Sequence, residues 1–329
     1  MLNEKEENSH YSIDKYIDII PVRKSLRRNN PIKKLMILRQ CLKTIKPDVV
    51  ISFLHHISIY THFSLLGLKI PHIVSERNDP VQYPEKKLLR FLRDYTFIKA
   101  DGCVFQTAGA KNYFPAIVQN KSVIIPNPVV IMHESARPFM REKKIAAVGR
   151  LIPQKNYNMM IRAFARFSEQ VPDYKLFICG EGPLRFDIEK LIKSLGLADS
   201  IMLMGQVKNP HEIIFDSAVF ALSSDHEGMP NALLEAMALG VPSVSTDCPS
   251  GGAANLVKNY ENGILVPVGD VQAMADAFKM ITGDPEFSSK LSENGKQLLL
   301  TYSIDSIAEK WLRYIYTMVI SDAHSFNSS

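Results

Sequence analysis

The sequence predicts an α/β protein made of two doubly wound domains, each built on a parallel sheet. Short apolar runs recur along the chain, and segments with the apolar spacing of helices separate them. This alternation of strand and helix is typical of parallel sheets with crossover helices. The 329 residues, 46% of them hydrophobic and 22% charged, are enough for two ordinary globular cores.

The first half of the chain is expected to supply one such sheet. A short strand is predicted at 16–22, and a basic helical stretch at 23–43 follows it. The continuous apolar run PDVVISF at 47–53 predicts a strand buried on both faces. Two more apolar runs, at 70–76 and 101–107, predict further strands that helical segments separate.

Two prolines in IPNPVV end this alternation, and the polar segment after them is expected to be a linker. We therefore divide the chain into an N-terminal domain (1–130), a linker (131–143), a C-terminal domain (144–303), and a final helix with a tail (304–329). The final helix is expected to cross back to the N-terminal domain.

In the second half six strands are expected, and each is expected to be followed by a helical segment. They lie at 145–149, 174–180, 200–205, 218–224, 241–246 and 263–268. Two helices near 285–299 and 303–320 complete this half, and a frayed tail is expected from residue 322.

The four cysteines are scattered and form no CxxC pair. We therefore expect reduced thiols, and neither a disulfide framework nor a metal site. No apolar run reaches the roughly 18 residues that a membrane span requires, and MLNEKEENSH lacks the apolar core of a signal peptide. These features predict a cytoplasmic protein.

Charge is unevenly shared between the two halves. Residues 1–140 carry 21 Lys and Arg against 12 Asp and Glu, whereas residues 141–329 carry 18 against 22. Basic residues alternate with apolar ones at helical spacing in 23–43 and 85–95. Such helices suit the anionic inner face of a cell membrane, although solvated faces of ordinary helices have the same pattern. No nucleic-acid reading motif accompanies the charge, so no nucleic-acid partner is expected.

Ligands of doubly wound sheets bind beyond the carboxyl ends of the strands. Arg150 and Lys155 follow the strand at 145–149. Arg150 could bind a diphosphate through its planar guanidinium, and Lys155 could bind it as a point charge. Two exposed loop cations would give the same pattern. Val207 follows the strand at 200–205, and an aromatic base could lie on the backbone there.

After the strand at 174–180, Gly180 and Gly182 flank Glu181, and Pro183 is expected at the first helical position. The glycines could let the backbone approach a ligand, or they could form a plain tight turn. The third glycine of a dinucleotide fingerprint is missing, which argues against a hydride-transfer enzyme.

The stretch DHEGMPNALLEAMALG (225–240) predicts an apolar helix that nevertheless carries Glu235, with Glu227 just before it. Pro230 suits the first helical position, so nearby amides would point outward with the positive end of the helix dipole and could bind an anion. These amides belong to Gly228, Met229 and Asn231. Glu235 could accept hydrogen bonds from a ligand's diol, or it could lie on a solvated strip or pair with a structural arginine.

The segments GRLIPQKN (149–156), CGEGPLR (179–185) and EGMPNALLE (227–235), the last continuing into EAMALGVPSVST, resemble the GT4 family of retaining glycosyltransferases. The resemblance covers residues 45–320. It implies the GT-B fold, in which two Rossmann-like domains face a cleft, and transfer of a sugar from a nucleotide sugar without a metal or other cofactor.

The resemblance also implies roles for the residues singled out above. Arg150 and Lys155 would hold the donor diphosphate, Glu235 the ribose, and the region around Val207 the base. The transferred sugar would meet Glu227 and the amides of residues 228–231. Gly180 and Glu181 are counted with the substrate-binding residues.

In the first domain, SERNDP (75–80) and IPNPV (125–129) resemble a bacterial GT4 subgroup that extends polyprenyl-diphosphate-linked oligosaccharides. This likeness implies a UDP-linked hexose or N-acetylhexosamine as donor and a lipid-linked or surface polysaccharide, such as lipopolysaccharide or capsule, as product. Arg77 and Asn78 stand where many relatives have a histidine near the reacting sugar. We expect them to contact donor or acceptor.

Members of the family usually begin with a strand and a glycine-rich loop, often GGxE, that approaches the donor phosphates. This sequence has no such segment, so we expect part of the first sheet and one wall of the cleft to be missing. A non-catalytic nucleotide-sugar-binding remnant is therefore an alternative to an active transferase, and an epimerase on the same scaffold is a third. The sequence leaves the sugar, the acceptor and the oligomeric state open.

Overall fold

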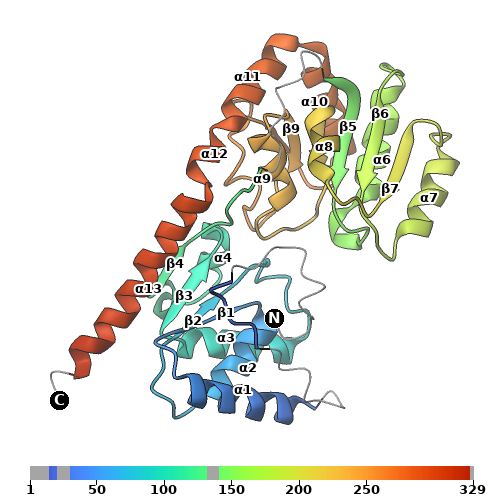
Figure 1. Cartoon of the computed structure of the whole chain (residues 1–329). Helices are drawn as coiled ribbons and strands as arrows, with labels where there is room; N and C mark the ends of the chain where they lie inside the picture. Colours follow the sequence, from blue (N-terminus) through green and yellow to red (C-terminus); the bar gives the residue numbers. More distant parts are fainter. Residues whose placement is uncertain (1–14, 21–29, 132–140, 327–329) are drawn as a thin grey trace.

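The computed structural model describes residues 15–20, 30–131 and 141–326, and the side chains as far as residue 319 (Figure 1). Two parallel sheets organise these residues. No helix in the described ranges combines the length and the apolar character that crossing a membrane would require.

The first sheet has four parallel strands in the order β1-β2-β3-β4. The strands are β1 (Val50–Phe53), β2 (His72–Ser75), β3 (Gly102–Phe105) and β4 (Ser122–Ile124). The helices of this part of the chain are α1 (Pro31–Ile45), α2 (His55–Leu65), α3 (Lys87–Lys99), α4 (Ala108–Asn112) and α5 (Ala116–Gln119).

The second sheet has six parallel strands in the order β10-β9-β8-β5-β6-β7. The strands are β5 (Glu142–Val148), β6 (Lys175–Cys179), β7 (Ile201–Gly205), β8 (Ser217–Leu222), β9 (Ser243–Thr246) and β10 (Ile264–Val266). The chain adds strands in one direction from β5 to β7 and in the other from β8 to β10. The carboxyl ends of β5 and β8 therefore form the switch point at which doubly wound sheets bind their ligands.

Eight helices and one 3-10 turn are described in this half of the chain. They are η3 (Pro153–Lys155), α6 (Tyr157–Ser168), α7 (Arg185–Ser194), α8 (Pro210–Asp216), α9 (Asn231–Ala238), α10 (Val271–Gly283), α11 (Pro285–Lys296), α12 (Leu298–Thr301) and α13 (Ile304–Phe326). Apolar side chains of α6 and α10 pack on one face of the sheet, and those of α8 and α9 pack on the other.

The α13 helix leaves the second half of the chain and lies along the first sheet (Figure 1). Its side chains Ile307 and Trp311 pack with Ile73, Val104 and Ile125. The opposite face of this sheet is covered by an aromatic core in which Phe97 stacks on Phe114 and Phe105 packs against both at a tilt. Each face of the first sheet is thus buried by a different part of the chain.

The phenol of Tyr314 ties α13 to the sheet through backbone groups. Its oxygen accepts the N–H of Cys103 at 2.9 Å, and its hydroxyl donates to the carbonyl of Lys121 at 2.6 Å. Burial raises the pKa of Tyr314, because the ionised phenolate would lose its hydration. The phenol is therefore neutral at any ordinary pH and can act as a donor.

Two expected strands in the first half of the chain differ from the structure. Residues 16–20 form a turn and irregular backbone instead of the strand expected at 16–22, because Asp18 interrupts the apolar run and no described strand pairs with it. Residues 21 and 22 lie outside the described ranges. β1 begins only at Val50 and lies at the edge of its sheet, so it is not buried on both faces and Phe53 is exposed.

The sequence analysis misses β4, because its three residues follow directly on helical segments and show no alternation. β5 begins at Glu142, inside the predicted linker 131–143, because Glu142 pairs with Ser217 of β8. Residues 132–140 of that linker lie outside the described ranges.

Four helical expectations also need correction. Pro183 lies in a turn two residues before α7, and Pro230 is the residue before α9, with an extended ψ of 96°. β9 leads through turns, and no helix, to β10. α13 continues to Phe326 instead of fraying at 322, since extending a packed helix costs little.

The basic helix expected at 23–43 begins at Pro31 in the structure. Asn30 caps it by accepting the N–H groups of Ile32 and Lys33. Residues 23–29 lie outside the described ranges.

We predict that Tyr314→Phe lowers the free energy of unfolding by about 1 kcal/mol, because the backbone N–H of Cys103 and the carbonyl of Lys121 lose their hydrogen bonds to the hydroxyl. Tyr316→Phe is the matched control on the same helix, since Tyr316 is exposed. Urea unfolding followed by circular dichroism measures both. Equal stabilities of the two variants would show that the hydroxyl of Tyr314 does not hold α13 in place.

Candidate active site

Two loops meet at the switch point. The loop after β5 contains η3, and the loop after β8 leads to α9. Backbone and side chains join them: the N–H of Asp225 donates to the carbonyl of Gln154 at 2.9 Å, and the amide of Gln154 donates to the carbonyl of His226 at 2.8 Å. Asn156 donates to the carboxylate of Asp225 at 2.7 Å. The two loops therefore form one unit.

Lys155 and Glu227, both predicted from the sequence, meet in this unit. The ammonium of Lys155 lies 2.5 Å from Oε1 of Glu227, and the hydroxyl of Ser224 donates to the same oxygen at 2.7 Å. Ser250 donates to the backbone carbonyl of Glu227. Glu227 is buried, and its Oε2 makes no hydrogen bond with any described residue. One carboxylate oxygen is thus fixed and the other is available.

Arg150 differs from Lys155, although both follow β5. Its side chain is exposed, and its guanidinium makes no ion pair with any residue of the described ranges. Lys155 lies close by, because a Cβ added at Gly149 would be 3.1 Å from the Lys155 Cε. Arg150 is therefore an exposed cation in the same loop as Lys155, without a counter-charge among the described residues.

The glycines after β6 have a reason that the sequence analysis did not weigh. Gly180 has a φ of +151°, and a Cβ there would lie 1.9 Å from the carbonyl oxygen of Gly149. The N–H of Leu151 also donates to the carbonyl of Glu181 at 2.9 Å. Gly180 is needed because two backbones approach each other. The carboxylate of Glu181 pairs with Arg185 at 2.5 Å and makes no contact with Lys155 or Glu227.

Glu235 has a partner that the sequence analysis missed. Its Oε2 lies 3.2 Å from Nε2 of His211 on α8, and both side chains are partly buried. Nothing in the sequence signals this pair, since the two residues are 24 positions apart. Val207 is partly buried in the loop between β7 and α8, so the same segment carries Val207 and His211.

The first turn of α9 has open backbone donors. The N–H groups of Leu233 and Leu234 both donate to the carbonyl of Pro230 at 3.1 Å, and no side chain caps the helix. The N–H of Asn231 lies two residues before that of Leu233, at the positive end of the helix dipole. This end of α9 suits an anion or an electron-rich oxygen.

Residues of the first sheet reach this unit. Gly228 lies against Arg77 and Asn78, so that an added Cβ would be 2.5 Å from the carbonyl oxygen of Arg77. Asn127 bridges the two halves of the chain: it accepts from Nη1 of Arg77 at 2.7 Å and donates to Oδ1 of Asn231 at 2.6 Å. The structure therefore brings together candidate residues from both halves of the sequence.

Arg77 is also held by aromatic rings. Its guanidinium lies 5.0 Å from the ring centroid of Phe53 and 5.6 Å from that of Trp311. Burial lowers the pKa of Arg77 to about 10, so the guanidinium stays charged at neutral pH. Met229 is buried, and its sulfur accepts the N–H of Asn127 at 3.1 Å.

Asn127, His211, Ser224 and Ser250 are the site residues that the sequence analysis did not single out. Asn127 lies between the two prolines that we interpreted as a break in the chain. The motif IPNPV, which contains Asn127 and resembles the bacterial subgroup, was a further signal. In the described ranges no three His, Cys, Asp or Glu residues are grouped so that they could hold a metal ion.

The family described as Glycosyl transferases group 1 matches residues 131–298. Two similar proteins come from Campylobacter jejuni. The GalNAc-alpha-(1->4)-GalNAc-alpha-(1->3)-diNAcBac-PP-undecaprenol alpha-1,4-N-acetyl-D-galactosaminyltransferase is 32% identical over 286 residues, 86% of this chain and 78% of the relative. The N-acetylgalactosamine-N,N'-diacetylbacillosaminyl-diphospho-undecaprenol 4-alpha-N-acetylgalactosaminyltransferase is 34% identical over 266 residues, 76% of this chain and 71% of the relative.

Among solved structures, this chain is similar to a mutant of TarM from S. aureus in complex with Fondaparinux, alpha-GlcNAc-glycerol and UDP. The TM-score is 0.74 with 20% sequence identity over 86% of this chain, which spans 59% of the length of TarM. The likeness confirms the expected GT-B fold with its two parallel-sheet domains.

We predict that Lys155→Met lowers the free energy of unfolding by about 3 kcal/mol, because it leaves the buried carboxylate of Glu227 without its counter-charge. Arg150→Met removes a cation from the same loop but should change stability by less than about 0.5 kcal/mol, since Arg150 is exposed. Guanidinium unfolding monitored by circular dichroism compares the two. Similar losses in both variants would contradict the stabilising role of the ion pair.

Proposed function

Because the chain belongs to the group 1 glycosyltransferases, we propose that it transfers an N-acetylhexosamine from UDP to a polyprenyl-diphosphate-linked saccharide with retention of configuration. The names of the two Campylobacter relatives state transfer of N-acetylgalactosamine to such an acceptor, and the TarM structure contains UDP. The observation that carries the proposal is the Lys155–Glu227 ion pair at the switch point, with the exposed cation of Arg150 in the same loop.

In this proposal the donor diphosphate binds between Arg150, Lys155 and the first turn of α9. Arg150 supplies a planar fork that no protein carboxylate occupies, and α9 supplies open amides. Lys155 is held in place by Glu227 and would share its ammonium with a phosphate oxygen. These counter-charges would perform the task that a divalent cation performs in metal-dependent transferases, and we propose that no metal is required.

Glu235 would bind the ribose of the donor. His211 fixes one oxygen of its carboxylate and leaves the other for a hydroxyl of the diol. The base would lie along the loop that contains Val207, beside Gly180 and Glu181 of the neighbouring loop. The loop after β6 and the loop after β7 could hold the planar base between them.

The transferred sugar would lie between the available oxygen of Glu227 and the loop that carries Arg77 and Asn78. Gly228 brings these two parts of the chain within contact distance, so a sugar at Glu227 is also near the first sheet. Charged and amide groups of both halves can then hydrogen-bond its hydroxyls. The acceptor would approach from the side of the first sheet.

Transfer would follow a same-face route. The acceptor oxygen attacks the anomeric carbon as the bond from that carbon to the diphosphate oxygen breaks, and the acceptor proton passes to the leaving diphosphate. Arg150, Lys155 and the start of α9 stabilise the negative charge that develops on the leaving group. Such preorganised electrostatic stabilisation is usually the largest contribution to the rate.

We predict that the purified chain releases UDP from UDP-N-acetylgalactosamine or UDP-N-acetylglucosamine when an undecaprenyl-diphosphate-linked disaccharide is supplied, and that EDTA leaves the rate unchanged. Lys155→Ala and Glu235→Ala should each lower turnover by about 10²-fold or more. Glu189→Ala is the control, since that exposed carboxylate pairs with Arg185 and with no other residue that the structure describes. Folding of each variant is checked by circular dichroism.

Normal turnover in folded Lys155→Ala or Glu235→Ala would contradict the assigned donor site. UDP binding without sugar transfer to any acceptor would instead support the binding remnant. Isomerised donor sugar without an acceptor would identify an epimerase.

A lipid-linked acceptor requires the chain to reach the inner face of the cell membrane, and we propose that the basic helices α1 and α3 provide this contact. Leu88 and Phe91 are 70% and 66% exposed on α3, beside Lys87 and Arg90. Ile32 is likewise exposed on α1. Apolar side chains next to cations suit the interface of an anionic bilayer.

We predict that the double variant Leu88→Ser/Phe91→Ser reduces binding to phosphatidylglycerol vesicles at least tenfold, since each apolar side chain contributes about 1.5 to 3 kcal/mol when buried in lipid. Phe186→Ser on α7 removes an equally exposed aromatic ring from the second half of the chain and should have no effect. Vesicle sedimentation measures both. If the double variant sediments like the unaltered chain, α3 is not the contact.

A further inference from the structure

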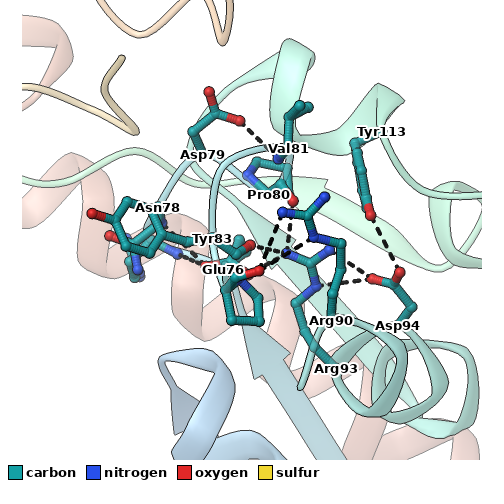
Figure 2. Close-up of polar contacts among 12 residues, drawn as sticks. Glu76, Asn78, Asp79, Pro80, Val81, Tyr83, Arg90, Arg93, Asp94 and Tyr113 are labelled. Atoms are coloured by element: carbon teal, nitrogen blue, oxygen red, sulfur yellow. Dashed lines mark hydrogen bonds and ion pairs between the residues drawn. The ribbon is translucent and has the colours of Figure 1, made fainter. Parts of the chain in front are cut away.

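The segment from Glu76 to Pro84, here called loop 76–84, connects β2 to α3. It presents Arg77 and Asn78 to Gly228 on one side. On its other side it lies over α3, and Figure 2 shows Arg90 and Arg93 rising from that helix toward it. The polar groups on this inner side are not explained by donor binding.

Glu76 fixes the start of the loop. Its own N–H donates to the carbonyl of Val104, which continues the parallel pairing of β2 with β3. Its side chain then turns back, and Oε1 accepts the N–H groups of Arg77 at 3.0 Å and Asn78 at 3.1 Å (Figure 2). The carboxylate is 1% exposed, and Oε2 has no hydrogen-bond partner. It therefore sets the backbone direction of both residues.

Arg93 is the counter-charge of this carboxylate. Its Nη1 lies 3.8 Å from Oε2 of Glu76, and its side chain is fully buried. The same Nη1 donates to the carbonyl of Pro80 at 2.9 Å and to the carbonyl of Tyr83. One guanidinium thus holds three points of loop 76–84. Nε of Arg93 donates to Asp94 at 2.8 Å, which fixes the guanidinium in turn.

The far end of the loop is held separately. Arg90 donates from Nε to the carbonyl of Pro84 at 3.3 Å, and the N–H of Val81 donates to Oδ1 of Asp79 at 2.8 Å. These contacts would keep the loop folded if the Glu76–Arg93 pair were altered. A change at Glu76 should therefore act first on Arg77 and Asn78.

The outer side of the loop touches the second half of the chain at two places. The carbonyl of Arg77 lies where a Cβ at Gly228 would be 2.5 Å away, and the ring of Tyr83 lies 5.8 Å from that of His226. Both contacts reach the segment that contains Glu227. The position of loop 76–84 therefore determines how Arg77 and Asn78 meet that segment.

We infer that Glu76 and Arg93 are a positioning pair for sugar transfer: the buried ion pair holds loop 76–84 so that Arg77 and Asn78 face the donor sugar. The inference rests on the proposed function and assigns a role to two residues that do not touch the substrate themselves. Loss of the pair should slow transfer while leaving UDP binding in the second half of the chain intact.

The charge of Glu76 is the switchable part of this pair. The pKa of Glu76 is raised to about 7: burial is the largest cause and Asp94 adds to it, while Arg93 and the two N–H donors act in the opposite direction. The charged and titratable groups that face the pair are Arg77 in the loop itself, Asp94 on α3, His55 on α2 and Tyr113 after α4. The carboxylate of Glu76 is therefore protonated, and loses its charge, as pH falls through about 7.

Activity and stability should respond to pH in opposite directions. Transfer needs the carboxylate, so kcat should rise as pH increases through about 7. The folded-state pKa lies above the unfolded value, so the stabilising contribution of the neutral carboxyl is complete below the unfolded pKa and is lost as pH rises through about 7. A residue with a purely structural role would not show a matching change in kcat.

The test is the pH profile of kcat and of the donor KM for the unaltered chain, Glu76→Gln and Glu85→Gln. Glu85→Gln is the matched control, since it makes the same chemical change at an exposed carboxylate just beyond the loop. The unaltered chain and the control should lose about tenfold in kcat from pH 8 to pH 6, as the ionised fraction of a group with pKa about 7 falls. The kcat of Glu76→Gln should already be low at pH 8, and it should not show this tenfold loss between pH 8 and pH 6.

A second variant and a binding measurement complete the design. Asp94→Asn should shift the pH range over which kcat falls to lower values, because it removes a negative charge that raises the pKa of Glu76. Calorimetric titration with UDP should give the same affinity for all variants. Superimposable kcat profiles of Glu76→Gln and the unaltered chain, or a parallel loss of UDP affinity in Glu76→Gln, would overturn the positioning role. Absence of UDP binding by the unaltered chain would overturn the proposed function instead.

Discussion

The reversal of strand order between β5 and β8 is the constraint on which the candidate site depends. Only there do the loops after two neighbouring strands diverge enough to leave room, and both loops carry charge. Lys155 comes from one and Glu227 from the other, and their ion pair joins the loops. A buried pair of this kind contributes little net stability compared with apolar residues, so its presence points to a requirement for charge at that place.

Sequence patterns predicted much of the second sheet, because its strands are continuous apolar runs bounded by Gly, Ser and Pro. The same rule overstated β1, which is equally apolar but lies at an edge, and it missed β4, whose three residues show no period. Whether a segment forms a strand depends on the neighbouring strand that it pairs with as well as on its own residues. For that reason Glu142 is in β5 although its own residue type favours a loop.

The candidate residues were recognised by type and by their place after strands, and the structure puts several of them together. Their partners could not be found in this way. His211 pairs with Glu235 across helices, and Asn127 joins Arg77 to Asn231 across domains, so each pair exists only after the chain has folded. Glu76 stood inside a motif that drew notice to its neighbours, and only its burial beside Arg93 sets it apart.

The packing of α13 against the first sheet brings the single tryptophan of the chain next to the cation of loop 76–84. The ring of Trp311 lies 5.7 Å from that of Phe53 and 5.6 Å from the guanidinium of Arg77. Indole emission depends strongly on nearby charge and water, and no other tryptophan contributes to the signal. The protein therefore contains a built-in optical probe of the contact between α13 and loop 76–84, which a fluorimeter can follow during turnover without any label.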